Sequence, residues 1–168
     1  NAAYLVLPYI GTIKNYSSAD YAVWLNNAAV ASMNLGQSSS EEYYLNKSDS
    51  LLKEAKNIWD KLPQRESYPE YATYLANYGD LCVARHNYKE AEKLRKKALE
   101  IHQKIGGNDA VLHDMDGLAY IYGEVGKYQE SLSLYVLLLK EYEKQNNFLD
   151  MARVSHLISK TYWIDIHD

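Results

Sequence analysis

The chain has 168 residues, of which 47% are hydrophobic, and it contains only 3 Pro and 8 Gly. It is therefore long enough to bury the core of one domain, and it is poor in the residues that favour disorder. The formal net charge of −4 gives no support to nucleic-acid binding or anionic-membrane binding. The single cysteine excludes an internal disulfide framework or a cysteine-rich metal site, and no apolar run approaches the roughly 20 residues of a membrane span.

The N-terminal segment is the least regular part of the chain. Residues 1–17 contain several apolar side chains, but Pro8 interrupts any long helix through them. We expect this segment to be a partial helix that caps the first full repeat.

A clear helical pattern begins at Ser18. The apolar stripe predicts a helix over 18–35, with Ser17 or Ser18 as its N-cap and Asp20 in the first turn, where the helix dipole favours a carboxylate. A Ser-rich turn follows, and a second helix is predicted over 41–62, where Pro63 ends it.

The rest of the chain predicts five more helices. Pro69 is suited to the first turn of the next one, and the sequences Gly106-Gly107, Gly126-Lys127 and Asn146-Asn147 are expected to end later ones. The predicted helices cover 69–85, 88–105, 110–126, 128–146 and 149–165.

The helices recur as pairs with a period near 40 residues. Moving 40 residues along the chain takes Tyr88 to Tyr128 and Ala91 to Ser131, and such a period is typical of stacked helical repeats. The first repeat is longer by about seven residues, because its first helix aligns with the next at an offset of 50 and its second helix at an offset of 43.

These alignments predict one all-α domain, a right-handed α-α superhelix of antiparallel helix pairs. The half repeat at the end and the lack of an initiator Met lead us to expect a piece of a larger protein. The predicted parts are a capping segment at 1–17, repeats at 18–66, 67–107 and 108–147, and a terminal helix within 148–168.

The order of residues within a repeat resembles the tetratricopeptide repeat. A small residue at Gly79 is followed by Tyr88, Ala91 and Ala98. The closest likeness is to the longer form, of about 40 residues, found in kinesin light chains and in arrays that precede CHAT domains of bacterial proteins. The resemblance covers about residues 18–165. Ser131 departs from it, since the family prefers Ala there.

The resemblance implies a binding groove on the concave face, because the first helix of each pair lines that face in such arrays. Ala29, Gly79, Ala119 and Ser159 are taken as equivalent positions. The exposed groove positions are then expected to be Asn26, Asn27, Val30 and Asn34; Thr73, Asn77, Asp80 and Ala84; His113, Asp116, Tyr120 and Glu124; and Arg153, His156, Lys160 and Trp163.

Two features of this predicted groove suggest its ligand. Asn27 and Asn77 fall where related arrays use amides to hydrogen-bond an extended peptide, although they could instead serve the packing between helices. The groove has amides at one end, acids in the middle and Arg153, Lys160 and Trp163 at the other end. We therefore expect a peptide with a basic centre and an acidic or aromatic end.

No other pattern predicts chemistry. The basic stripe Lys89, Lys93, Lys96, Lys97 and Lys104 alternates with glutamates, as a solvated helix face does. The His-Asp clusters at 113–116 and 165–168 lack the spacing of a metal site, and Cys82 is expected to be a buried, inert thiol.

The sequence therefore predicts a non-catalytic scaffold that binds a protein or peptide, without a cofactor or metal, nucleic acid or membrane insertion. Weak self-association through the solenoid ends is expected to be possible. Two alternatives stay open: the regulatory or sensor region of a multidomain enzyme, such as a CHAT-type protease or a signalling kinase, and a structural self-association module. The compartment stays open between cytoplasm and periplasm.

Overall fold

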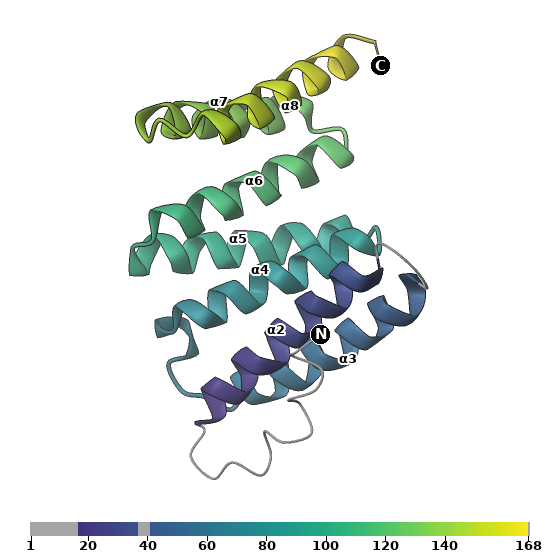
Figure 1. Cartoon of the computed structure of the whole chain (residues 1–168), viewed down its shortest axis with the longest axis vertical. Helices are drawn as coiled ribbons and strands as arrows, with labels where there is room; N and C mark the ends of the chain where they lie inside the picture. The colour runs from purple at the N-terminus through teal and green to yellow at the C-terminus, as the bar shows by residue number, and fades with distance from the viewer. Residues whose placement is uncertain (1–16, 37–40, 168) are drawn as a thin grey trace.

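The computed structural model describes residues 17–36 and 41–167, and every regular element within these ranges is helical. The α-helices, labelled as in Figure 1, are α2 (Ser18–Gly36), α3 (Glu41–Trp59), α4 (Pro69–Ala84), α5 (Tyr88–Ile105), α6 (Asn108–Glu124), α7 (Tyr128–Lys144) and α8 (Phe148–His167). A short 3-10 helix, η1 (Arg65–Ser67), lies between α3 and α4. Residues 1–16 of the predicted capping segment and most of the Ser-rich turn lie outside the described residues.

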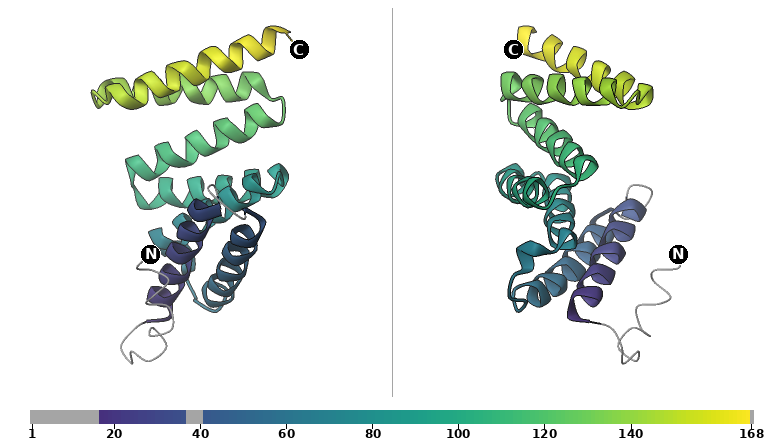
Figure 2. Two further views of the ribbon diagram at one scale, coloured as in Figure 1. Left: turned by 45° about the vertical axis from the view of Figure 1, so that its right-hand side comes forward. Right: turned by 90° about the vertical axis from the view of Figure 1, so that its left-hand side faces the viewer.

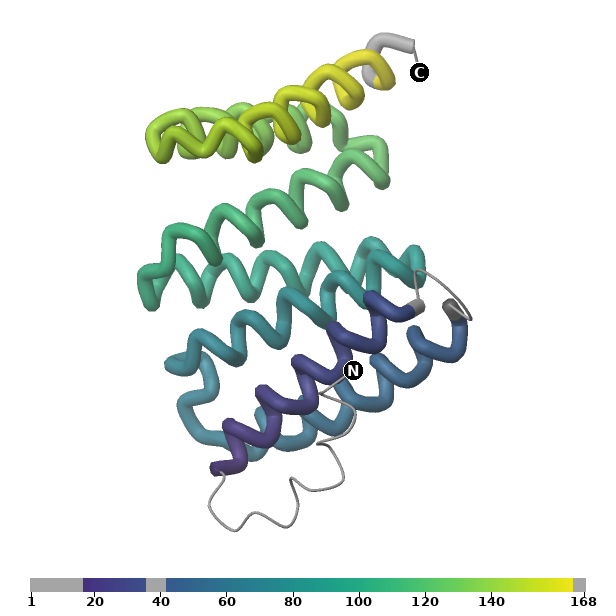
Figure 3. The backbone as a smooth tube through the Cα atoms, in the orientation of Figure 1, coloured from purple at the N-terminus to yellow at the C-terminus, as the bar shows by residue number. Residues whose placement is uncertain are grey.

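Antiparallel helix pairs are stacked into a superhelix, as predicted. The pairs are α2 with α3, α4 with α5, and α6 with α7, and α8 packs on α7 at the end of the stack (Figures 1 and 3). The first pair is rotated relative to the later ones, which gives the stack its twist (Figure 2). None of the described helices combines the length and the apolar character needed to cross a lipid bilayer.

The first helix begins at the capping residues that its sequence predicts. The Ser17 hydroxyl accepts a hydrogen bond from the Asp20 backbone N–H at 3.2 Å, and the Asp20 carboxylate accepts one from the Ser17 backbone N–H at 3.0 Å. This reciprocal arrangement is a capping box, which satisfies two N–H groups at the start of the helix.

Three helices end with the same backbone geometry. His86, Gly126 and Asn146 follow α4, α6 and α7, and all have positive φ angles, of 55°, 76° and 53°. At each end the next residue's N–H donates to a carbonyl in the last helical turn; for example, the Asn87 N–H donates to the Cys82 oxygen at 2.8 Å. This is the Schellman pattern, and it ends α6 and α7 two residues earlier than predicted.

The helix predicted over 41–62 also ends early, at Trp59. Pro63 cannot continue a helix, and Gln64 adopts a left-handed conformation with φ 60°. The connection between α3 and α4 is consequently much longer than the connection between α5 and α6, which consists of Gly106 and Gly107.

Two apolar clusters form most of the core. The larger one joins α2, α3, α4 and α5 around Leu25, Leu52, Trp59 and Leu75, and the other joins α6, α7 and α8 around Leu138 and Val154. The junction between α5 and α6 lies between these clusters. A small apolar cluster of Cys82, Ala91 and Ile121 makes part of the contact there, and buried polar side chains make the rest.

Candidate peptide-binding groove

A pocket of about 440 Å³ opens between the first helices of successive pairs. Its lining comes from α4 (Asp80, Val83, Ala84), α6 (His113, Asp116, Gly117, Tyr120), α8 (Arg153, Leu157) and two residues of the second helices (Arg95, Tyr135). A smaller pocket of about 60 Å³ shares Tyr120, Tyr135 and Leu157 and extends the lining to Glu124 and Lys160. We call the continuous surface the α4–α6–α8 groove.

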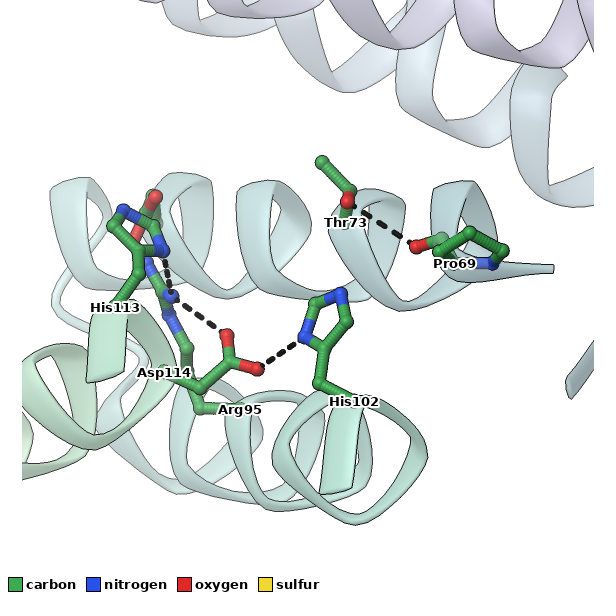
Figure 4. A network of polar contacts seen from close by, with 7 residues as sticks. Pro69, Thr73, Arg95, His102, His113 and Asp114 are labelled. Atoms are coloured by element: carbon green, nitrogen blue, oxygen red, sulfur yellow. Dashed lines mark hydrogen bonds and ion pairs between the residues drawn. The ribbon is translucent and has the colours of Figure 1, made fainter. Parts of the chain in front are cut away.

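Eight of the sixteen predicted groove positions therefore line one surface: Asp80, Ala84, His113, Asp116, Tyr120, Glu124, Arg153 and Lys160. Asn27, Asn34 and Thr73 are exposed on α2 and α4, and His156 and Trp163 are exposed on α8. The Thr73 hydroxyl donates to the Pro69 carbonyl oxygen one helical turn earlier, at 3.2 Å (Figure 4).

The prediction that Asn26 is an exposed groove position is wrong. Asn26 is only 4% exposed, and its side-chain oxygen accepts a hydrogen bond from the half-buried Asn77 amide at 3.2 Å. Asn26 lies on the side of α2 that faces α4, so this amide pair joins two neighbouring first helices. Asn77 therefore serves the packing between helices, the second of the two roles considered for it. Asn27 is solvent-exposed.

A buried arginine crosses from a second helix into the α4–α6–α8 groove. Arg95 belongs to α5 and is 2% exposed, yet its guanidinium reaches the pocket between α4 and α6. Glycines on both helices leave room for it: a Cβ atom at Gly79 would lie 3.1 Å from Arg95 Cγ, and one at Gly117 would lie 2.7 Å from Arg95 Nε. The small residue predicted at Gly79 therefore makes space for an arginine side chain.

Carboxylates on two helices hold the Arg95 guanidinium. It donates to Asp80 of α4 through Nη2 and to the fully buried Asp114 of α6 through Nη1, at 3.1 Å. The second Asp114 oxygen lies 2.6 Å from Nδ1 of the buried His102, and His113 Nδ1 lies 3.2 Å from Arg95 Nη1 (Figure 4). This network joins α4, α5 and α6, and it satisfies a charge that burial would otherwise penalise heavily.

The same core positions are apolar or aromatic in the other pairs. Arg95 is equivalent to Leu52 and Tyr135, and His102 is equivalent to Trp59 and Tyr142. Sequence reasoning missed this network because the surrounding lysines dominate the pattern of α5. The available signal was the helical spacing, which places Arg95 and His102 on the same stripe as the buried Ala91 and Ala98.

A second ion pair closes the other wall of the groove. Arg153 of α8 lies 3.1 Å from Asp116 of α6 and also 3.1 Å from Asp150 of its own helix. Its side chain is 41% exposed, so solvent screens this pair much more than the buried one.

Tyrosines supply neutral hydrogen-bonding groups in the groove. Burial raises the pKa of Tyr135 to about 12, and burial together with the nearby Glu124 raises the pKa of Tyr120. Both hydroxyls therefore stay protonated at neutral pH. Glu124 also accepts a hydrogen bond from the Tyr88 hydroxyl at 3.0 Å, which fixes its carboxylate at the groove edge.

The remaining chemical candidates behave as structural residues. Burial raises the pKa of the Cys82 thiol to about 11, which leaves it protonated and unreactive at neutral pH. The basic stripe of α5 forms ion pairs along its own helix, such as Lys96 with Glu92 at 2.6 Å. Among the residues described, no group of three His, Cys, Asp or Glu side chains is placed to hold a metal ion.

Stacked antiparallel helix pairs with an open groove along the first helices define a helical-repeat protein. Residues 70–144 match the family described as "Tetratricopeptide repeat", and the stacked pairs have the fold of a tetratricopeptide-repeat-like solenoid. Tetratricopeptide repeats generally mediate protein–protein interaction and typically act as non-catalytic scaffolds.

A solved structure with a similar fold is BtubC (BKLC) from P. vanneervenii, with a TM-score of 0.63 and 14% sequence identity. The match covers 89% of this chain and 67% of that chain. No curated protein matches the chain.

Proposed function

We propose that the α4–α6–α8 groove binds an extended peptide or a helix of a partner protein, and that this domain is a non-catalytic scaffold. The observation that carries the proposal is a continuous groove in which side chains from three successive first helices meet. The partner would then contact several repeats at once, as repeat proteins permit.

The charges of the groove favour a ligand of mixed polarity. Asp116 lines the larger pocket and Glu124 lies at the groove edge in the smaller one, whereas Lys160 and Trp163 belong to the last helix. A basic side chain of the peptide would be placed beside these two acids, and an acidic or aromatic one beside α8. Asp80 and Asp116 contribute less than the sequence suggested, because Arg95 and Arg153 already pair with them, which leaves Glu124 as the main acid for a basic side chain.

The test is peptide selection followed by affinity measurement. Peptides selected on the wild-type domain from a random display library are titrated by fluorescence anisotropy against Tyr120→Ala and Glu124→Lys. We expect each variant to weaken binding at least tenfold, which corresponds to about 1.4 kcal/mol. Lys93→Glu on the exposed face of α5 is the matched control and should bind like wild type.

Equal affinity of the wild-type domain and both groove variants would refute the proposal. Asn27→Ala separately tests the predicted amide contact, because Asn27 is exposed and its removal leaves the buried Asn26–Asn77 pair intact. If the domain is instead the regulatory or sensor region of a multidomain enzyme, the same groove would bind a segment of the attached catalytic domain.

Self-association through the α8 end is a second candidate, and one observation favours it. Ala152, Ser155, Ser159 and Tyr162 are exposed on α8, while the equivalent residues of α2, α4 and α6 are buried or half-buried against their partner helices. A concentration-dependent dimer in light scattering, abolished by Ser155→Glu, would support this candidate. A strictly monomeric protein at all concentrations would exclude it.

A further inference from the structure

A second pocket, of about 470 Å³, lies between α3, α4 and α5. Its floor is the face of α4 that carries Tyr71, Tyr74 and Tyr78, and Leu94 of α5 contributes to one wall. Its α4 residues differ from those that line the α4–α6–α8 groove. Tyr78 and Asp80 are about 200° apart around the helix, so the two pockets open on opposite sides of α4.

The long connection between α3 and α4 accounts for this space. Residues 60–68 include the left-handed Gln64 and η1, and α4 contacts α3 along a much shorter stretch than α6 contacts α5. In Figure 1, α3 runs at an angle to α5, whereas α5, α6 and α7 follow one another as layers. At the α5–α6 junction the His102–Asp114 contact bridges the two helices directly.

The tyrosines form a ladder along the pocket floor. Adjacent ring centroids are 6.0 Å apart, with Tyr71 and Tyr74 stacked at an interplanar angle of 20°. Trp59 supports the end of the ladder, 5.5 Å from Tyr71. Leu75, Leu81 and Cys82 add apolar surface beside the ladder, and charged side chains on or next to α3, α4 and α5 form the rim.

The tyrosine hydroxyls have no hydrogen-bond partner in the described part of the chain. Tyr74 is 2% exposed, and neither its hydroxyl nor those of Tyr71 and Tyr78 forms a hydrogen bond within residues 17–36 and 41–167. The Tyr74 hydroxyl oxygen is not itself enclosed, so a ligand or solvent can reach it from the pocket. Burial raises the pKa of both Tyr74 and Tyr78, so each keeps a proton to donate.

The charged residues at the rim are already paired. Asp49 binds Lys53 at 2.8 Å and Arg85 at 3.4 Å. Asp60 binds Lys56 at 2.5 Å, and Glu90 binds Lys93 at 3.3 Å. An ionic ligand would have to compete with these contacts, whereas an uncharged one would leave them intact.

We propose that this pocket is a binding site for a small, uncharged aromatic ligand that carries a hydrogen-bond acceptor. The ligand's ring lies against the tyrosine ladder, and its acceptor receives the hydrogen bond of the Tyr74 hydroxyl. The pocket volume falls in the range of small-molecule sites, which are mostly apolar with a few placed polar groups. The site is separate from the proposed peptide groove.

The experiment uses coumarin, an uncharged bicyclic aromatic with a carbonyl acceptor, in a titration followed by amide chemical shifts of the whole chain. We expect the shifts to centre on residues 71–82 and Leu94, and a carboxylated coumarin to bind at least tenfold more weakly. Tyr74→Phe keeps the ring and should weaken coumarin binding about fivefold. Leu94→Trp should fill the pocket and abolish binding, while Tyr120→Phe in the peptide groove should change nothing.

Three results would overturn parts or all of this assignment. If coumarin does not shift these resonances, or if Tyr74→Phe and Leu94→Trp both leave the titration unchanged, the site does not exist. If Leu94→Trp abolishes binding but Tyr74→Phe has no effect, the hydrogen bond is refuted. Equal binding of the carboxylated coumarin would refute the preference for an uncharged ligand.

Discussion

Substitution of Gly117 by Ala tests the buried network most directly. The new Cβ atom would lie 2.7 Å from Arg95 Nε and 2.8 Å from Arg95 Cζ, closer than side-chain atoms approach without displacement. Arg95 is enclosed, with Gly79 on the other wall of its slot, so its guanidinium must withdraw from Asp114. Asp114 is fully buried and would then keep only His102 as its partner.

The expected cost follows from two opposing effects. Breaking a buried ion pair costs about 3–5 kcal/mol, and replacing Gly by Ala inside a helix stabilises it by about 1 kcal/mol. We therefore expect Gly117→Ala to lower the free energy of unfolding by about 2–4 kcal/mol in urea denaturation followed by circular dichroism. Without the network, the helix propensity alone would make the substitution stabilising.

Gly123→Ala is the matched control on the same helix. Its Cβ atom would meet Ser131 Oγ at 3.6 Å, an ordinary contact, so this variant should be as stable as wild type or more stable by up to about 1 kcal/mol. In an Arg95→Ala background the cost of Gly117→Ala should disappear. If Gly117→Ala is as stable as Gly123→Ala in the wild-type background, the proposed arginine slot is wrong.

Three further predictions concern single side chains. Asn77→Ala should destabilise the fold by about 1–2 kcal/mol because it leaves the buried Asn26 oxygen unpaired, while Asn27→Ala should change stability by less than about 0.5 kcal/mol in the same denaturation assay. Arg153→Ala should cost at most about 1 kcal/mol despite its two carboxylate partners, because the pair is solvent-exposed; a loss as large as that of Arg95→Ala would contradict this. Native Cys82 should react with iodoacetamide at a rate that rises toward pH 11 rather than near pH 9. Its raised pKa contributes folding stability below about pH 9, and this contribution is lost as the pH rises toward 11. Rapid alkylation of the native protein at pH 8 would show that the thiol is not buried.

Local sequence patterns determined the helices and their order. The capping pair Ser17 and Asp20, the prolines near residue 63 and the stop at Gly126 act through the backbone within one or two turns. Such signals are readable without a tertiary structure. The helix after Glu41 was predicted too long because Pro63 acts four residues before itself: its ring would clash with a helical carbonyl at Trp59, where the helix ends.

The candidate groove was predictable at positions of a first helix that face solvent between the first helices of the neighbouring repeats. Repeat periodicity placed His113, Asp116, Tyr120 and Arg153 on one surface, since equivalent residues of stacked repeats share an orientation. It failed at Asn26, because the rotation between α2 and α4 decides whether that amide faces solvent or the next helix.

The sequence by itself thus determined an all-helical stack of paired repeats, because periodicity and capping are properties of short segments. Only the tertiary structure decided which charged residues are buried. Arg95 and Asp114 lie on different helices and 19 positions apart, and each would be costly in the core alone. Their compatibility depends on glycines at 79 and 117 that open a slot between α4 and α6, and that spatial coincidence of four residues is defined only by the folded stack.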